Sequence, residues 1–159
     1  MRLLLAQHGH ALGKDEDPLR ALSDEGKQAV EQVAGQLKAG GVRVARVWHS
    51  GKLRAEQTAI LLAKHVLPGG KPEQVDGIAP NDPVEEFIAD ADVWQEDTLV
   101  VGHLPFMSRL VSLLLVGDAA HGIVEFSPGT LVCLERTSPD TWRLLWMLRP
   151  GLQGSGTRP

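Results

Sequence analysis

The chain has 159 residues, of which 43% are hydrophobic and 23% charged, a balance typical of one globular domain and not of a disordered segment. A formal net charge of −4 provides no general attraction to nucleic acid or to an anionic membrane. Cys133 is the single cysteine, which excludes an internal disulfide and favours a reducing compartment. The longest largely apolar stretch, Leu110–Val116, is far too short to span a membrane, and the N-terminus lacks a signal-peptide pattern. We therefore expect a soluble, cytoplasmic protein.

Strand and helix signals alternate in the first half of the chain. An apolar run of strand length comes first, and a polar loop over His8–Leu22 follows it. Ser23 is a predicted N-cap, because carboxylates follow it in the first turn, and Gly40-Gly41 ends that helix. The predicted regular elements of this half are strands over Leu3–Ala6 and Val44–Trp48, a helix starting after Ser23, and a helix over about Lys52–Val66.

The second half continues the alternation and closes with a hairpin. Asp82-Pro83-Val84-Glu85 predicts a helix start, with Asp82 as the N-cap, and this short helix should run through Ala91. Trp142 and Trp146, four residues apart on a predicted strand, should share one face and pack in the core. The other predicted elements are a strand over Thr98–Val101, a helix from Pro105 to about Val116, and an antiparallel hairpin of Thr130–Leu134 with Trp142–Leu148.

These elements predict the fold class. Strands that alternate with helices, followed by a hairpin, make a three-layer α/β/α domain whose central sheet is mostly parallel. We assign residues 1–149 to this domain. The remaining segment, 150–159, is rich in Gly, Ser and Pro and is predicted to be a disordered tail.

The candidate catalytic residues lie in three strand-to-helix turns. His8 follows the first strand, Arg54 lies just after the second, and His103 follows the third. Loops at the carboxyl ends of strands are where open α/β sheets bind ligands. Two imidazoles and a guanidinium at one such edge would suit a phosphoryl group, because one nitrogen can attack phosphorus while the other groups neutralise oxygens.

Together the three turns resemble the motifs of the histidine phosphatase superfamily, which has the phosphoglycerate mutase-like fold. In size and motif order they are most similar to its short branch, the SixA-type phosphohistidine phosphatases. The resemblance extends from Met1 to about Leu148, and the loop Asp17–Ser23 also resembles that branch's Arg-Pro-Leu-Thr element. Gln7-His8-Gly9 matches the family's Arg-His-Gly element. The family's Ser-x-x-x-Arg-Ala-x-Gln-Thr element is matched by Ser50, Arg54, Ala55, Gln57 and Thr58. The third element, Gly-His before a helix, is matched by Gly102-His103, which Leu104-Pro105 follows.

The resemblance implies a role for each residue of the site. His8 would attack phosphorus and form a phosphohistidine intermediate that water hydrolyses, and no metal or other cofactor is needed. Gly9 would let the backbone pass close to the phosphate, and Arg54 would clamp two of its oxygens. A protonated His103 would stabilise negative charge that grows on the phosphoryl oxygens. Gln57 and Thr58 are expected to support the Arg54 helix.

Two features depart from the family pattern. Gln7 stands where the family has an arginine, so one cation is missing beside the phosphate. Arg20, Lys14 or His10 would compensate, or the site binds phosphate and turns over slowly or not at all. No carboxylate matches the general acid that protonates alkoxide leaving groups in many superfamily members. Its absence favours phosphohistidine over a sugar phosphate, because imidazole is the better leaving group.

We therefore predict an enzyme that dephosphorylates phosphohistidine on a protein, such as a phosphorelay or phosphotransferase component. A small-molecule phosphomonoesterase and a catalytically weak phosphate-binding regulatory module stay open as alternatives. A mutase is the least favoured. The pair His8 and His10 has a metal-ligand spacing, but no cysteine or carboxylate cluster accompanies it. His49 is expected to be structural, with a substrate contact as the alternative.

Overall fold

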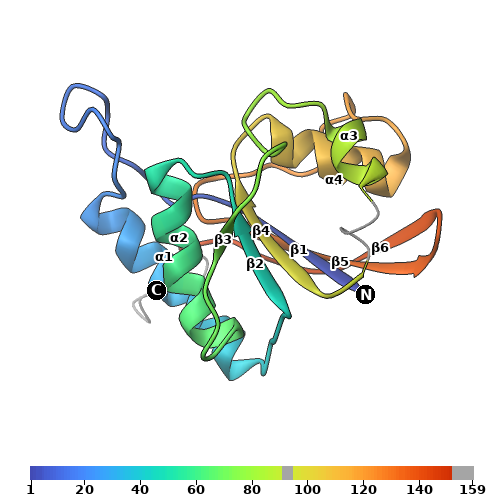
Figure 1. The fold of residues 1–159 in the computed structure, drawn as a ribbon, viewed down its shortest axis with the longest axis horizontal. Coiled ribbons are helices and arrows are strands. Elements are labelled where there is room, and N and C mark those ends of the chain that lie inside the picture. Colours follow the sequence, from blue (N-terminus) through green and yellow to red (C-terminus); the bar gives the residue numbers. More distant parts are fainter. Residues whose placement is uncertain (91–94, 152–159) are drawn as a thin grey trace, which may run out of the picture.

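The computed structural model describes residues 1–90 and 95–151 and forms three layers (Figure 1). Among these residues, no helix has both the length and the apolar character needed to cross a membrane. The strands are β1 (Arg2–Gln7), β2 (Arg46–His49), β3 (Glu73–Gln74), β4 (Thr98–Gly102), β5 (Leu131–Ser138) and β6 (Thr141–Leu148). The helices are α1 (Asp24–Ala39), α2 (Leu53–Val66), α3 (Val84–Ala89) and α4 (Phe106–Val116).

The central sheet has the order β3-β2-β4-β1-β5-β6 in the described part of the chain. Pairing is parallel from β3 to β1, while β5 runs antiparallel to both β1 and β6. The predicted three-layer fold, with a mostly parallel sheet and a C-terminal hairpin, is therefore confirmed. The sequence gives no signal for β3, because its two residues, Glu73 and Gln74, are polar and exposed.

Successive side chains of β1 point to opposite faces of the sheet and contribute to a hydrophobic core on each face. Leu4 and Ala6 pack with α1 and α2, while Leu3 and Leu5 pack with the residues of α3 and α4. Figure 1 shows the two helix pairs on opposite sides of the sheet. A strand covered on both faces must be apolar at every position, which is why β1 is recognisable as an uninterrupted run in the sequence.

The predicted shared face of the two tryptophans on β6 is wrong. Cys133 of β5 pairs with Trp146, whereas the next residue of β5 pairs with Leu144, so Leu145 is an extra residue in β6. One extra residue reverses the face on which the following side chains lie. Trp146 therefore packs against the α1 and α2 side, and Trp142 against the α3 and α4 side, both half-buried.

The predicted helix starts have different outcomes. Ser23 is the N-cap of α1, and its Oγ accepts a hydrogen bond of 3.0 Å from the Gly26 N–H. Asp82 is not the N-cap of α3, because its Oδ2 accepts from the Ala79 N–H at 2.8 Å and closes the preceding turn. The predicted end of that helix at Ala91 lies outside the described residues, as does the part of the predicted disordered segment 150–159 from residue 152 onward.

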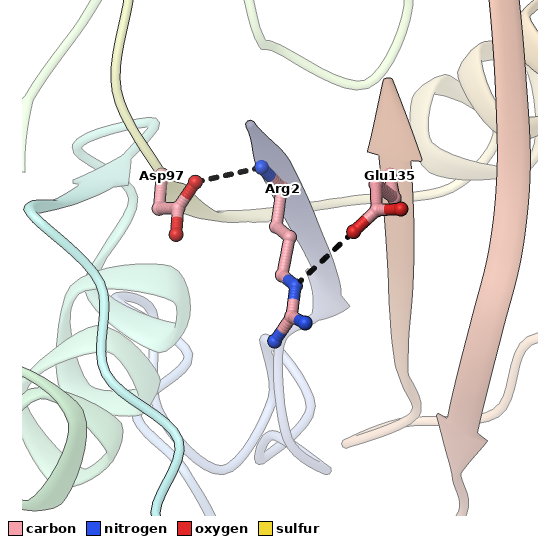
Figure 2. A network of polar contacts seen from close by, with 3 residues as sticks. All are labelled: Arg2, Asp97 and Glu135. Carbon is pink, nitrogen blue, oxygen red and sulfur yellow. Dashed lines mark hydrogen bonds and ion pairs between the residues drawn. The ribbon is translucent and has the colours of Figure 1, made fainter. Parts of the chain in front are cut away.

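Arg2 joins three strands at the edge of the sheet opposite the turns that carry the histidines (Figure 2). Its backbone N–H donates to Asp97 Oδ1 at 2.7 Å, just before β4, and its guanidinium Nε lies 3.6 Å from Glu135 Oε2 on β5. The ion pair is about half exposed and contributes little stability by itself. The contacts instead help to fix the start of β1 between its two neighbours.

Gly26 and Gly35 offer a matched pair of substitutions on α1. A Cβ on Gly26 would collide with the backbone carbonyl of His10, so Gly26→Ala must displace the loop that follows β1. A Cβ on Gly35 meets nothing within 4 Å. We expect Gly26→Ala to lower the free energy of unfolding by about 1–3 kcal/mol and Gly35→Ala to raise it by about 0.5–1 kcal/mol. Urea denaturation measures both, and equal effects would show that the loop does not rest closely on α1.

Candidate active site

The structure brings the three turns together at one edge of the sheet. They follow β1, β2 and β4, which are neighbours, so their carboxyl ends lie side by side. The rings of His8 and His103 have centroids 5.0 Å apart and are tilted by 52°. Arg54 lies in the first turn of α2, and its positive charge lowers the pKa of both histidines. The predicted histidines and arginine thus form one cluster.

His8 has the tautomer that a nucleophile needs. Its Nδ1 lies 2.7 Å from the carbonyl oxygen of Gly9, which can only accept a hydrogen bond, so Nδ1 carries the proton. The lone pair is therefore on Nε2. Burial lowers the pKa of His8 to about 4, with smaller contributions from the charges of Arg54 and Arg20. The ring is neutral, and hence nucleophilic, near pH 7.

His103 is almost fully buried, and it differs from the expected protonated form. Burial, followed by the charges of His8 and Arg54, lowers the pKa of His103 to about 3, so the ring is neutral near pH 7 in the free protein. Its Nε2 lies 2.6 Å from Ser50 Oγ. If the Ser50 hydroxyl donates to Nε2, the ring proton is on Nδ1, and a neutral His103 still presents a donor from that atom. Ser50 belongs to the Ser-x-x-x-Arg motif, but its hydrogen bond to His103 joins two different turns and leaves no local pattern in the sequence.

Thr58 ties the turn of His8 to the helix of Arg54. Its buried hydroxyl donates to the carbonyl oxygen of Arg54 at 2.8 Å and accepts from the Gly9 N–H at 3.0 Å. Gln57 makes a second link, because its Oε1 accepts from the Leu22 N–H at 2.7 Å. These contacts agree with the expected supporting roles of both residues.

Gly9 lies where a side chain would meet α1 and the end of the following loop. A Cβ at this position would lie 2.8 Å from Val30 Cγ2 and 3.2 Å from Leu22 Cδ2. The missing side chain therefore makes room for α1 and the end of the loop. The Gly9 N–H is also occupied by Thr58, so this amide is not a free donor for phosphate.

The loop between β1 and α1 brings Arg20 into electrostatic range of the site. The loop extends from the body of the molecule and is closed at its base by a bridge between Ala11 and Leu22 (Figure 1). Arg20 adopts a left-handed backbone conformation, with φ of 53°, and its Nε donates to the Leu12 carbonyl at 3.1 Å. Its charge lowers the pKa of Arg54 and of both site histidines. Arg20 is thus well placed to replace the missing arginine.

The other candidate residues have structural partners or lie at the rim. Lys14 lines the same cavity as Arg20 and Arg54. His10 is exposed, and its Nδ1 lies 2.7 Å from Ser23 Oγ at the start of α1. His49 is buried, and its Nδ1 accepts from the Gly51 N–H at 3.1 Å, a structural contact. Within residues 1–90 and 95–151, no group of three or more His, Cys, Asp or Glu side chains is arranged to hold a metal ion.

Buried polar atoms without a hydrogen-bond partner are concentrated in this cluster. In the described part of the chain they are Gln7 Oε1, Arg54 Nε and His103 Nδ1. A buried polar group without a partner is costly, and proteins keep such groups where a ligand satisfies them. All three atoms belong to residues that the sequence assigned to phosphate binding. A half-turn of the Gln7 amide would present its NH₂ group, a donor, in place of the oxygen.

Comparison with known proteins places the chain beside one relative in sequence. The chain is 30% identical over 128 residues to an uncharacterized protein of a Picosynechococcus strain, covering 76% of this chain and 77% of the relative, which places the two in one family. No protein-family model matches the chain.

Several solved structures share the fold. The protein histidine phosphatase SixA complexed with tungstate is 24% identical with a TM-score of 0.82, and the match covers 94% of this chain and 97% of that one. A SixA structure from Agrobacterium tumefaciens is 22% identical with a TM-score of 0.76 and the same coverage. Phosphoserine phosphatase of Entamoeba histolytica, in complex with 3-phosphoglyceric acid, is 13% identical with a TM-score of 0.71, covering 94% and 98%. These are the phosphoglycerate mutase-like folds that the motifs predicted.

The lowered pKa values of His8 and His103 predict how stability depends on pH. Both histidines titrate near 6.5 in the unfolded chain but only at about 4 and about 3 in the folded protein. Between these values the unfolded chain binds protons that the folded protein does not. The free energy of unfolding therefore falls as pH drops from 6.5 towards 4, by up to about 1.4 kcal/mol per pH unit for each histidine.

Urea denaturation of wild type and of the His8→Gln and His103→Gln variants between pH 7 and pH 5 measures this effect. Each variant should lose its share of the pH dependence. His121, which is exposed on a loop, provides the control variant His121→Gln. A pH dependence that is the same in all four proteins would contradict the neutral, desolvated state of the site histidines.

Proposed function

The chain has the fold of the histidine phosphatase superfamily, and we propose that the protein is a phosphatase whose nucleophile is His8. The observation that carries the proposal is the set of unpartnered buried atoms in Gln7, Arg54 and His103, gathered around a neutral imidazole. A phosphoryl group supplies acceptor oxygens for Arg54 Nε and His103 Nδ1, and for the NH₂ group of Gln7 once its amide is turned by half a turn. The phosphatases among the proteins of similar fold support the same reaction class.

The first chemical step is attack by His8 on phosphorus. The Nε2 lone pair forms the new P–N bond while the bond from phosphorus to the leaving group breaks, and the leaving group takes that electron pair. The Nδ1–H remains hydrogen-bonded to the Gly9 carbonyl, which holds the ring in line and stabilises its growing positive charge. Water then attacks phosphorus, the P–N pair returns to His8, and inorganic phosphate and a proton are released.

The other residues stabilise the charge on the transferred group. Arg54 and Arg20 supply positive charge, His103 donates from Nδ1, and the amide of Gln7 donates without adding charge. A bound phosphoryl dianion would also raise the pKa of His103, because it places negative charge beside a ring that is now surrounded by cations. Ser50 positions that ring through its bond to Nε2.

Phosphohistidine on a protein is the substrate class that we favour. Its leaving group is an imidazole, which departs without a strong general acid, and Asp82 is occupied in closing a turn. The SixA structures with this fold support the choice. Cys133 is a buried free thiol, which supports the proposed cytoplasmic location.

A small-molecule phosphomonoesterase is the second candidate. Glu56 lines the same cavity as Arg54 and is the carboxylate that would protonate an alkoxide leaving group. A weakly active phosphate-binding module is the third, supported by the neutral amide of Gln7 in place of a cation.

Replacing His8 tests the nucleophile. We expect wild type to hydrolyse a protein phosphorylated on histidine faster than phosphoserine, and His8→Ala to lose at least about a thousandfold in kcat/KM. Intact mass after a rapid quench should show one added phosphoryl group on wild type and none on His8→Ala. His121→Ala is the control. If folded wild type binds phosphate but shows neither turnover nor a phosphoryl adduct, the phosphatase proposal is refuted. The phosphate-binding module is then the remaining candidate function.

Replacing Gln7 tests the departure from the family motif. Gln7→Arg adds a charged donor to the phosphate site, and one charge-assisted hydrogen bond is worth roughly 1.5–3 kcal/mol. We therefore expect kcat/KM for p-nitrophenyl phosphate to rise by about tenfold to a hundredfold. The near-isosteric Gln7→Met, which removes the amide, should lower it. A fall in kcat/KM for Gln7→Arg would show that Arg20 already fills the position of the missing cation.

A further inference from the structure

Two cavities, one of which begins at the catalytic cluster, lie along α2 and share Glu56. The first, of about 540 Å³, lies beside the site and is lined at its mouth by Arg54 and Glu56. The second, of about 610 Å³, continues past Glu56 to Ile60 and Lys64. Glu56 lines both cavities, and the residues 56, 60 and 64 recur at helical spacing, so they lie on one face of the helix. We call this continuous surface the α2 groove.

The α2 groove is cationic on an acidic protein. Its lining includes six Lys and Arg residues but only one carboxylate, that of Glu56, whereas the chain has a net charge of −4. None of the six forms an ion pair with any residue of the described chain. These cations are Lys14, Arg20, Lys52 and Arg54 near the site, and Lys64 and Lys71 at the far end. The positive charge therefore extends well beyond what one phosphoryl group needs.

The length of the groove indicates the kind of ligand. From Arg54 to Leu67 the helix rises by about 20 Å at 1.5 Å per residue. A small phosphate ester would occupy only the end beside the site, whereas an extended peptide of about six residues would span the whole length. No Phe or Trp lines either cavity, so the stacking platforms typical of single-stranded nucleic acid sites are missing from the groove.

The middle of the groove offers both apolar and polar contacts. Ile60 is 44% exposed, which leaves an apolar surface between the two groups of cations. His49 lines the second cavity, and because its Nδ1 accepts from Gly51, its neutral ring carries the proton on Nε2. An apolar side chain and a hydrogen-bond acceptor of a bound peptide would therefore both find partners.

We propose that the α2 groove binds an extended acidic segment of the phosphorylated protein, next to the residue whose phosphoryl group enters the site. The inference rests on the proposed function, because it takes the ligand to be the phosphate-bearing protein. Carboxylates of the segment would pair with Lys64 and Lys71, and an apolar side chain of the segment would cover Ile60. The far end of the groove, with Lys64 and Lys71, would thereby select among phosphorylated proteins without taking part in the chemistry.

Binding of two labelled peptides tests the inference without any turnover. The first is a fluorescein-labelled peptide of about eight residues that alternates glutamate with alanine and carries one central leucine. The second has lysine in place of every glutamate. By fluorescence anisotropy at low salt, the acidic peptide should bind His8→Ala and wild type alike, and the lysine peptide should bind at least about tenfold more weakly.

Charge reversal at the far end of the groove is the decisive variant. Lys64→Glu with Lys71→Glu should weaken binding of the acidic peptide at least about tenfold and leave hydrolysis of p-nitrophenyl phosphate unchanged. The control is Lys38→Glu with Arg143→Glu, two exposed cations of α1 and β6 that line neither cavity, which changes the net charge equally. The control should bind like wild type.

Three results would overturn the proposal. They are equal binding of the two peptides, equal weakening by the two double variants, and tighter binding of a single-stranded oligonucleotide than of the acidic peptide. Peptide binding that follows the expected pattern in a protein without phosphatase activity would support the groove and refute the proposed function. Failure of the groove proposal and failure of the proposed function therefore give different results.

Discussion

The hydroxyl of Thr58 is the contact on which the geometry of the site depends. It is buried, donates to the carbonyl of Arg54 and accepts from the amide of Gly9, so one oxygen fixes the turn after β1 against the first turn of α2. His8 and Arg54 belong to segments about fifty residues apart in the chain. Without a short link between them, their separation would depend on the packing of whole helices, and a phosphoryl site tolerates little such variation.

Desolvation governs the chemistry of the cluster. Burial lowers the pKa of His8 and His103, and it also lowers that of Arg54. The histidines respond by remaining neutral, whereas a guanidinium keeps its charge. The free site therefore combines a neutral imidazole at His8 with a permanent cation at Arg54. The buried ring of His103 is a third group, and its protonation can follow the charge of a bound group.

The sequence predicts the fold and the members of the cluster because both leave local patterns. Buried strands such as β1 are uninterrupted apolar runs, and His8, Arg54 and His103 each stand in a strand-to-helix turn. Contacts that depend on three-dimensional packing are not visible in this way. The bond from Ser50 to His103 joins two different turns, and the need for glycine at position 9 comes from α1, which packs there only in the folded chain.

The extra residue in β6 has a consequence for how the molecule behaves among copies of itself. This strand forms one edge of the sheet, and Leu144 and Leu145 are 46% and 39% exposed there. An edge strand with exposed leucines would be a template for another strand if it were flat and regular. The bulge at Leu145 breaks the regular spacing of the ladder, while the opposite edge, β3, is only two residues long. Neither edge of the sheet offers a long, even strand for growth, so the fold resists fibrous self-association.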